Sequence, residues 1–248
     1  MSVRVSGSRK EREWAAREQM IISHAQRLLL RDGYQNLNLD ELAKEIEYSK
    51  GTIYQHFEAK EDLALGVATR ALRERAEMFE RAALFEGGTR ERARAIGFAC
   101  CEFATAHRDF FSVELMLRSA SFWERASEGR KQLHAVQAGR CFRAMNAIAM
   151  DAIRVKDLPK GVRSEQVVFS LIAVTMGSHI AGVNPDIQQL CGIDNPIESV
   201  RRNQDLVCDG WGWKPLSTEV DYRETDRRIG AEVFPNSVWY RRRGRGAR

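Results

Sequence analysis

Hydrophobic residues recur along most of the chain at intervals of three and four positions, which is the period of an amphipathic α-helix. Residues 1–18 are polar and charged, and a continuous apolar face begins only at Ile21 and runs to Leu29. Gly33 suits the left-handed position that commonly ends a helix. The pattern predicts a first helix that begins after the polar stretch and ends at Gly33.

Two short helices are predicted next, with a sharp turn between them. Asn38 can cap the first, whose apolar face ends at Ile46. Ser49 can cap the second, in which Ile53 and Phe57 lie one turn apart. Three closely spaced helices with a sharp turn between the second and third are typical of a helix-turn-helix.

The rest of the chain is predicted to be helical as well. It has only five prolines, which favours helices over a turn-rich sheet architecture. Residues 211–248 show no clear period, although the stretch 232–240 could be extended. The fold class indicated by the pattern is all-α. The further helices are expected at residues 60–85, 89–107, 109–116, 121–155, 164–180 and 196–209.

The charge of the chain is mildly basic and unevenly placed. The net charge is +5 and the pI is about 9.1, a balance that permits nucleic-acid binding without establishing it. Residues 240–248 hold five arginines and no acidic residue. This tail could contact phosphates or simply solvate a flexible end, and the second interpretation is the simpler one.

The sequence lacks the motifs of common enzymes and metal sites. No G-x-S-x-G, Walker A, G-x-G-x-x-G, H-E-x-x-H or zinc spacing is present, and the five histidines are scattered. We therefore expect no catalytic residue, metal or cofactor, and no enzyme activity. The polar N-terminus does not resemble a signal peptide, and no run approaches the roughly 18 apolar residues of a membrane helix. We expect a cytoplasmic protein that does not bind membranes.

The five cysteines form no C-x-x-C pair. In the cytoplasm they are expected to be reduced. Cys100 and Cys101 are adjacent and could sense redox state, or they could be small apolar residues that fill the core. Packing is the simpler interpretation, and the sequence leaves both open.

The most informative segment runs from Gly33 to Leu63 and reads GYQNLNLDELAKEIEYSKGTIYQHFEAKEDL. It resembles the DNA-binding domain of TetR/AcrR-family transcription regulators. A Leu-Ala pair at 42–43 stands where the family has Ile-Ala on its second helix. Residues 49–57 match the family's recognition helix almost residue by residue, and residues 60–63 match the start of its fourth helix.

The resemblance implies an architecture for the whole chain. An N-terminal three-helix helix-turn-helix DNA-binding domain would be joined by a long helix to a larger helical ligand-binding and dimerisation domain. The expected divisions are a polar N-terminal arm at 1–18, the DNA-binding domain at 19–65, the ligand and dimer domain at 66–210, and a C-terminal extension at 211–248 with a flexible basic end.

A recognition helix must present small or polar side chains to the major groove, which admits one α-helix. Thr52 and Gln55 are candidate readers of base edges, and Tyr54 suits a phosphate contact. Lys60 would place a cation beside the N–H groups that begin the fourth helix, an arrangement that favours a phosphate oxygen. Cap, turn and packing roles are the alternative for each residue. The candidate DNA-contacting residues are Ser49, Lys50, Gly51, Thr52, Tyr54, Gln55, His56 and Lys60.

Two positions depart from the family pattern. Glu47-Tyr48 stands where the family commonly has Gly-Val, and a non-glycine residue at positive φ costs roughly 1 kcal/mol. Ala59 stands where Ser or Asn would cap the fourth helix, which forfeits about 1 kcal/mol. Neither departure removes the motif.

The resemblance also implies an effector pocket in the larger domain, suited here to a small apolar or aromatic molecule. An aromatic and methionine stripe at helical spacing is more often core than pocket, so that alternative stands beside it. The candidate pocket residues are Phe103, His107, Phe111, Met116, Trp123, Phe142 and Met145.

Helix-turn-helix proteins usually bind pseudo-palindromic double-stranded DNA as symmetric dimers. In the family the last two helices form the dimer, here at 164–183 and 196–209. The residues that would suit such an interface, or equally an internal core, are Val168, Leu171, Ile172, Thr175 and Met176.

The function implied by the resemblance is a sequence-specific regulator, by family default a repressor that a small-molecule effector releases from DNA. The alternative is an architectural or division-linked DNA-binding protein of the same fold without an effector. A formed apolar cavity would favour the first function, and a packed interior the second.

Overall fold

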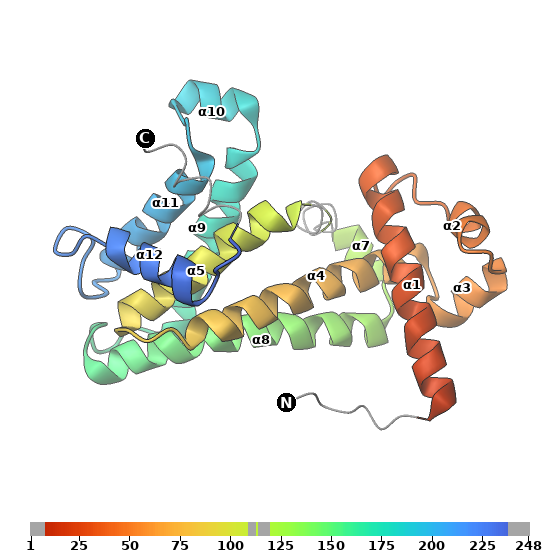
Figure 1. Cartoon of the computed structure of the whole chain (residues 1–248), viewed down its shortest axis with the longest axis horizontal. Coiled ribbons are helices and arrows are strands. Elements are labelled where there is room, and N and C mark those ends of the chain that lie inside the picture. Colours follow the sequence, from red (N-terminus) through yellow and green to blue (C-terminus); the bar gives the residue numbers. More distant parts are fainter. Residues whose placement is uncertain (1–7, 109–112, 114–119, 238–248) are drawn as a thin grey trace. The chain divides into compact units, whose positions relative to one another are not determined.

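The computed structural model describes residues 8–108, 113 and 120–237, and all regular secondary structure in those ranges is α-helix (Figure 1). The all-α prediction is confirmed. In chain order the described helices are α1 (Arg9–Asp32), α2 (Leu39–Glu45), α3 (Lys50–His56), α4 (Lys60–Ala83), α5 (Thr89–Ala106), α7 (Ala120–Arg125), α8 (Glu128–Val155), α9 (Ser164–Gly182), α10 (Pro185–Cys191), α11 (Pro196–Gly210) and α12 (Arg223–Glu232).

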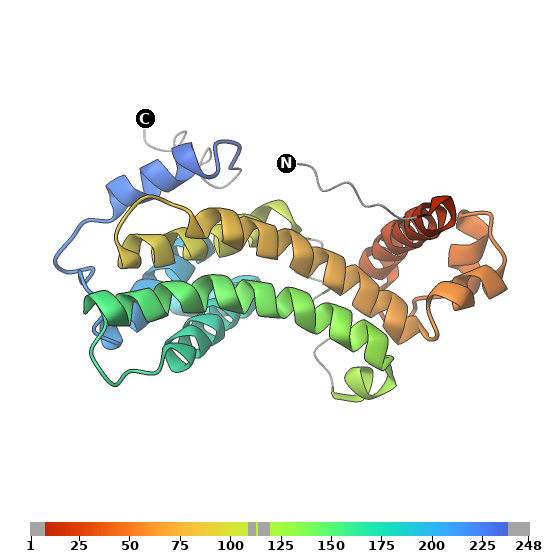
Figure 2. The same cartoon turned by 90° about the horizontal axis from the view of Figure 1, so that it is seen from below.

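The chain separates into two compact units. Unit 1 takes its described residues from 1–72 and 109–136, and unit 2 takes its own from 73–108 and 137–248. The helices α4 and α8 therefore each contribute residues to both units, and they lie side by side (Figure 2). In unit 2 they are joined by an ion pair of 2.6 Å between Arg140 and Glu80.

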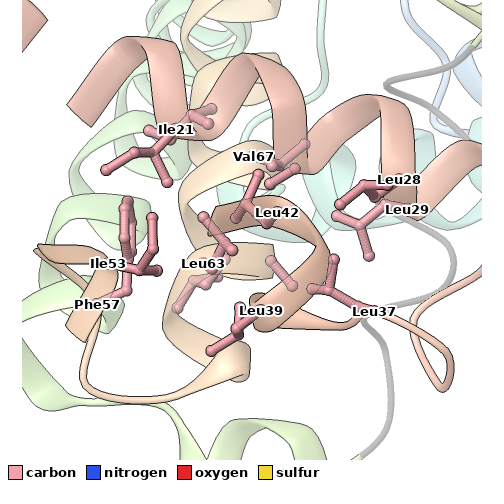
Figure 3. Close-up of a cluster of buried hydrophobic side chains, with 14 of the residues drawn as sticks. Ile21, Leu28, Leu29, Leu37, Leu39, Leu42, Ile53, Phe57, Leu63 and Val67 are labelled. Atoms are coloured by element: carbon pink, nitrogen blue, oxygen red, sulfur yellow. The ribbon is translucent and has the colours of Figure 1, made fainter. Parts of the chain in front are cut away.

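The core of unit 1 is built by the first four helices, as the apolar pattern predicts. Leu28 and Leu29 on α1, Leu42 on α2 and Phe57 after α3 belong to one buried cluster that runs between these helices (Figure 3). Each of these side chains is at most 2% exposed. Burial of a large apolar side chain contributes about 1.5–3 kcal/mol, so this cluster holds the two short helices α2 and α3 against α1.

Helix α1 begins at Arg9, well before the predicted start after residue 18. Ser8 and Glu11 form a capping box, in which the Ser8 hydroxyl accepts from the Glu11 N–H at 3.2 Å and the Glu11 carboxylate accepts from the Ser8 N–H. Arg9 and Glu13 add an ion pair of 2.7 Å across one turn. A cap contributes about 1 kcal/mol and such a pair about 0.3–0.5 kcal/mol. The apolar period could not reveal this start because polar contacts alone make it.

The turn between α2 and α3 has the strain expected from its sequence. Glu47 has φ 57°, in the left-handed region that glycine adopts most easily. The N–H of Tyr48 donates to the carbonyl of Ala43 at 3.0 Å, and that of Glu47 to Lys44 at 3.3 Å. These two bonds form a Schellman motif, which requires the left-handed residue. They hold Glu47 in place despite a cost of roughly 1 kcal/mol.

The segment after Gly210 contains a helix that the pattern does not predict. The carboxylate of Asp226, on α12, accepts from Arg94 on α5 at 2.8 Å and from Arg201 on α11 at 2.7 Å. Asp226 and Arg201 are each 5% exposed. Burial alone would raise the pKa of the Asp226 carboxyl, but the two guanidinium groups hold it below its usual range. Charge pairing therefore helps to hold α12 on unit 2, together with the buried Ile229 and with Phe234, which follows the helix and stacks on Phe98. One buried large apolar residue on the helix itself leaves too little apolar period for a sequence search to find.

Other predicted boundaries also change. The helix predicted at 121–155 is two helices, and α10 was missed although Asn184-Pro185 carries the same cap signal as Asn195-Pro196. Residues 232–237 end α12 and are not extended. The helix predicted at 109–116 and the arginine tail lie wholly or mostly outside the described residues.

No single helix in the described ranges is long and apolar enough to cross a membrane. By length and composition, only α9 and α10 taken together could form a span, and the pair is bent by 101°.

Candidate DNA-binding site

Helix α3 is fixed by one buried face and one capped end. The hydroxyl of Ser49 accepts from the N–H of Thr52 at 3.1 Å, which confirms the predicted N-cap. Ile53 and Phe57 are both fully buried. The opposite face of the helix is therefore turned outward by the packing itself.

The outward face carries most of the predicted DNA-contacting residues. Lys50, Gly51 and Gln55 are exposed, and Tyr54 is 45% exposed. Thr52 is half-buried beside the Ser49 hydroxyl, 2.9 Å from it. Small and polar groups on one side of a short helix suit the edges of base pairs in a major groove.

Gly51 has no structural reason to be glycine. A Cβ atom added there would meet only the Ser49 hydroxyl, at an ordinary contact distance of 3.6 Å. Glycine within a helix costs about 1 kcal/mol relative to alanine. The chain therefore gives up helix stability at a position where its own packing has room, which points to an external surface that comes close to the backbone.

Lys50 already has a partner within the chain. Its ammonium group lies 2.9 Å from a carboxylate oxygen of Asp40 on α2, and this hydrogen bond raises the pKa of Lys50. Both side chains are more than half exposed, so the pair is weak in water. A phosphate could replace Asp40 as the partner of Lys50 at little cost.

His56 is buried, whereas the other candidates are exposed or half-buried. Its ring stacks on that of Trp14 in α1 with centroids 3.8 Å apart, and its side chain has no exposed surface. Burial lowers the pKa of the imidazole although Glu18 lies 3.7 Å from Nδ1. The ring is thus directed into unit 1, and we leave His56 out of the DNA-contacting set proposed below.

Lys60 begins α4, as predicted. Its ammonium group donates to the carbonyl of Gln35 at 3.4 Å and lies 4.8 Å from the ring centroid of Tyr34. Ala59 offers no side-chain cap, but the carboxylate of Asp62 accepts from the N–H of Glu58 at 3.2 Å. This bond offsets part of the missing cap, and the held lysine leaves a cation beside the N-terminus of α4.

A support for α3 that the sequence analysis missed comes from α8. Arg130 donates to the main-chain carbonyl of His56 at 2.9 Å and to the carboxylate of Glu18 at 2.8 Å. Its guanidinium also lies 4.4 Å from the ring centroid of Phe57. Burial would raise the pKa of Glu18, but Arg130 and His56 hold it below its usual range. No local signal marks Arg130, because its partners on α1 and α3 are distant in sequence.

The predicted pocket residues are divided between the two units. Phe103, His107, Phe142 and Met145 belong to unit 2, whereas Trp123 belongs to unit 1. The remaining two candidates, Phe111 and Met116, lie outside the described residues.

In unit 2 Phe103 and Met145 are buried, whereas His107 and Phe142 are half-buried. Phe103 is 1% exposed and stacks on His107 with centroids 5.3 Å apart, while Glu74 lies 3.4 Å from His107. A cavity of about 430 Å³ in this unit is lined by other residues, among them Arg94, Asp205 and Tyr222. The rings of Phe103 and His107 therefore pack against each other, and a ligand between them would have to separate them.

The adjacent thiols lie in unit 2 as well. Burial raises the pKa of both Cys100 and Cys101 to about 12. Because the thiolate is the reactive form, this environment favours packing over redox sensing.

Comparison with known proteins agrees with this geometry. A family model described as "Bacterial regulatory proteins, tetR family" matches residues 21–67, the stretch from α1 into α4. No curated protein matches the chain.

Several solved structures share the fold at low sequence identity. PfmR, a TetR family transcriptional regulator from Thermus thermophilus, is 20% identical with a TM-score of 0.57, over 75% of this chain and 96% of its own. FadR from Bacillus subtilis, in complex with stearoyl-CoA, is 15% identical with a TM-score of 0.62, over 77% and 98%. A protein from Saccharomonospora viridis, in complex with choline, is 19% identical with a TM-score of 0.58, over 79% and 96%.

The family match falls on the helices whose outward face suits a major groove, and the fold extends the similarity over the larger helical unit. Residues 21–67 thus match the DNA-binding part of the tetR family, and the chain shares the all-α fold of solved TetR-family regulators.

Proposed function

We propose that the protein represses transcription by binding a pseudo-palindromic operator as a homodimer, and that a small-molecule effector releases it. The observation that carries the proposal is the outward face of α3. Gly51 on that face costs helix stability without any gain in internal packing, which a close approach of DNA would explain. A protein that binds an operator on bacterial DNA would act in the cytoplasm.

The roles within the DNA site follow from position and chemistry. Gln55 and Thr52 would read base edges, because both lie on the helix that enters the groove. Tyr54 and Lys60 would contact phosphates and set the register of the protein on the duplex. The proposed DNA-contacting residues are Ser49, Lys50, Gly51, Thr52, Tyr54, Gln55 and Lys60.

The homodimer is supported by an apolar stripe on α9. Phe169, Ile172 and Ile180, with Val183 just after the helix, are 71%, 45%, 46% and 59% exposed. Because the helix has 3.6 residues per turn, these four positions lie on one side of it. Leu206 on the neighbouring α11 is 59% exposed. A contiguous apolar surface of this kind marks a protein interface, and a second copy of the chain is the partner that a palindromic operator requires.

This stripe changes the predicted set of interface residues. Val168 and Thr175 are buried within the chain's own core, so they are not available to a partner. Ile172 alone among the five lies in the exposed stripe. Helix α9 is apolar on both sides, which is why its sequence could not separate the internal face from the external one.

The effector is supported by the relatives. Two proteins of the same fold were solved with small molecules, stearoyl-CoA in one and choline in the other. We propose that this chain takes a small apolar or aromatic effector in its larger helical unit, where Phe103 and His107 would separate to admit it. An architectural protein without an effector remains the second candidate, favoured by the tight packing of those two rings.

Selection of bound sites from a random duplex library, at a stated salt concentration, tests the function. A pseudo-palindromic site bound by two chains is the expected result, and effectors can then be screened by release from that site. Binding that is strong but indifferent to sequence would establish the architectural alternative. Absence of binding even at low salt would overturn the DNA-binding proposal.

A further inference from the structure

The first two turns of α1 extend beyond the core of unit 1. Residues 9–16 are exposed at every position, although this helix has a well-formed capping box. In Figure 1 this part of α1 continues past α3. A helical extension that buries almost no surface of its own gains little by folding alone, so its formation points to an external partner.

Two contacts place this extension beside the recognition helix. The ring of Trp14 stacks on His56, the last residue of α3. The guanidinium of Arg17 lies 5.6 Å from the ring centroid of Tyr48, which directly precedes the α3 cap. Helix α1 therefore passes along the flank of α3 on which His56 lies. Tyr54, two positions before His56, points to the other flank, because residues two apart on a helix do not share a face.

The face of α1 that these contacts define is basic. Lys10, Trp14 and Arg17 are spaced by four and three residues, so they lie on one side of the helix. Neither Lys10 nor Arg17 has a carboxylate partner among the described residues.

The acidic residues of the same segment are occupied elsewhere. Glu11 accepts from the Ser8 N–H, Glu13 pairs with Arg9, and Glu18 pairs with Arg130. The positive charge of Lys10 and Arg17 is therefore left without local compensation.

The dimensions of DNA indicate what this face would meet. A major groove is about 12 Å wide and an α-helix with its side chains about 10–12 Å across, so a recognition helix fills the groove. Whatever lies along the flank of that helix must face the sugar-phosphate backbone that forms the groove wall.

We propose that Lys10 and Arg17 form a second phosphate-binding surface, on the flank of α3 opposite Tyr54, and that Trp14 holds α1 in place for it. This inference rests on the proposed entry of α3 into the major groove. Tyr54 and Lys60 would then contact one wall of the groove, and α1 the other.

Arg12 provides a matched control. It has the same charge and lies on the same exposed extension, but it is two positions from Lys10 and so points to another side of α1. The variants Lys10→Ala, Arg17→Ala and Arg12→Ala are compared with the wild-type protein on the selected operator and on a scrambled duplex of equal length. Affinity is measured from 50 to 200 mM salt, and circular dichroism confirms that each variant is folded.

Lys10→Ala and Arg17→Ala should each make the salt dependence shallower by about one unit of slope, which removes about a fourfold loss of affinity over that salt range. The change should be equal on both duplexes, and Arg12→Ala should match the wild-type protein. The inference is overturned if all three variants keep the wild-type slope, or if Arg12→Ala changes it as much as the other two. Failure of the wild-type protein to prefer any duplex would instead overturn the proposed function.

Discussion

Arg130 of α8 donates a hydrogen bond to the main-chain carbonyl of His56, the last residue of the recognition helix, at 2.9 Å. The final carbonyls of a helix have no partners within it, and a cation there also complements the helix dipole. The same guanidinium binds Glu18 on α1. One side chain thus ties the end of α3 to two other helices of unit 1.

Arg130→Met should loosen this end of the recognition helix. We expect the free energy of unfolding to fall by about 1.5–3 kcal/mol, the usual range for hydrogen bonds to charged groups, measured by urea denaturation. Affinity for the operator should fall as well, while its salt slope should stay unchanged because Arg130 is assigned no phosphate. Arg130→Lys should recover part of the affinity. A shallower salt slope in Arg130→Met would instead make Arg130 a direct DNA contact.

Gly51→Ala should separate stability from function. Alanine is the better helix former and its Cβ fits the available space, so the free energy of unfolding should rise by about 0.5–1 kcal/mol. Operator affinity should fall roughly tenfold or more, which corresponds to about 1.4 kcal/mol, because the added methyl group lies where DNA approaches. Denaturation and fluorescence anisotropy on one preparation measure both effects. Unchanged affinity would show that Gly51 does not face the DNA.

His179, on α9, should make stability depend on pH. Burial, with a smaller contribution from Arg75, lowers the pKa of its imidazole to about 4. Because an unfolded histidine titrates near 6.5, the unfolded chain binds more protons between these values. The stabilisation is therefore complete above pH 6.5 and is lost as the pH falls toward 4, by up to about 3 kcal/mol.

The measurement for His179 is a difference between two proteins. Urea denaturation at pH 5 and pH 7 is compared for the wild-type chain and His179→Leu, because His56, whose pKa burial also lowers, contributes to the pH dependence of both proteins. The leucine variant should lose less stability between the two pH values. An equal loss in both proteins would mean that His179 is not the group responsible.

Phe169→Glu should break the proposed dimer. A carboxylate placed in an apolar interface must be desolvated, so the dissociation constant of the dimer should rise by roughly a hundredfold or more. Sedimentation velocity at several concentrations measures it. Leu84→Glu is the control, because Leu84 is 81% exposed and follows α4 rather than belonging to the α9 stripe, and this variant should remain a dimer. If both variants stay dimeric, the interface lies elsewhere.

The sequence predicts best where the determining contacts are local. Ser49 caps α3 through a residue three positions away, and the packing of Ile53 and Phe57 follows from their spacing. Glu47 was expected at positive φ because its place in the turn demands it. Such features depend on a few neighbouring residues, so a short stretch of sequence contains all the information that they require.

The features that were missed depend on distant partners or on charge alone. The contact between Arg130 and His56 spans 74 positions, and no sequence pattern near either residue predicts it. The early start of α1 comes from a cap and an ion pair, and α12 is held largely by the shared carboxylate of Asp226, so neither has a clear apolar period. The orientation of His56 depends on Trp14, an exposed residue in a segment that seemed merely polar.

The shared carboxylate of Asp226 has a practical consequence for anyone who shortens this protein. A version ended at residue 210 would keep every helix that a search for apolar periodicity finds. It would leave the buried guanidinium of Arg201 without its carboxylate partner, while Arg94 would keep Asp205 alone. Such a truncated protein should express poorly or aggregate, because a buried charge that loses its partner typically costs about 3–5 kcal/mol. The smallest version that folds well must therefore reach at least the end of α12.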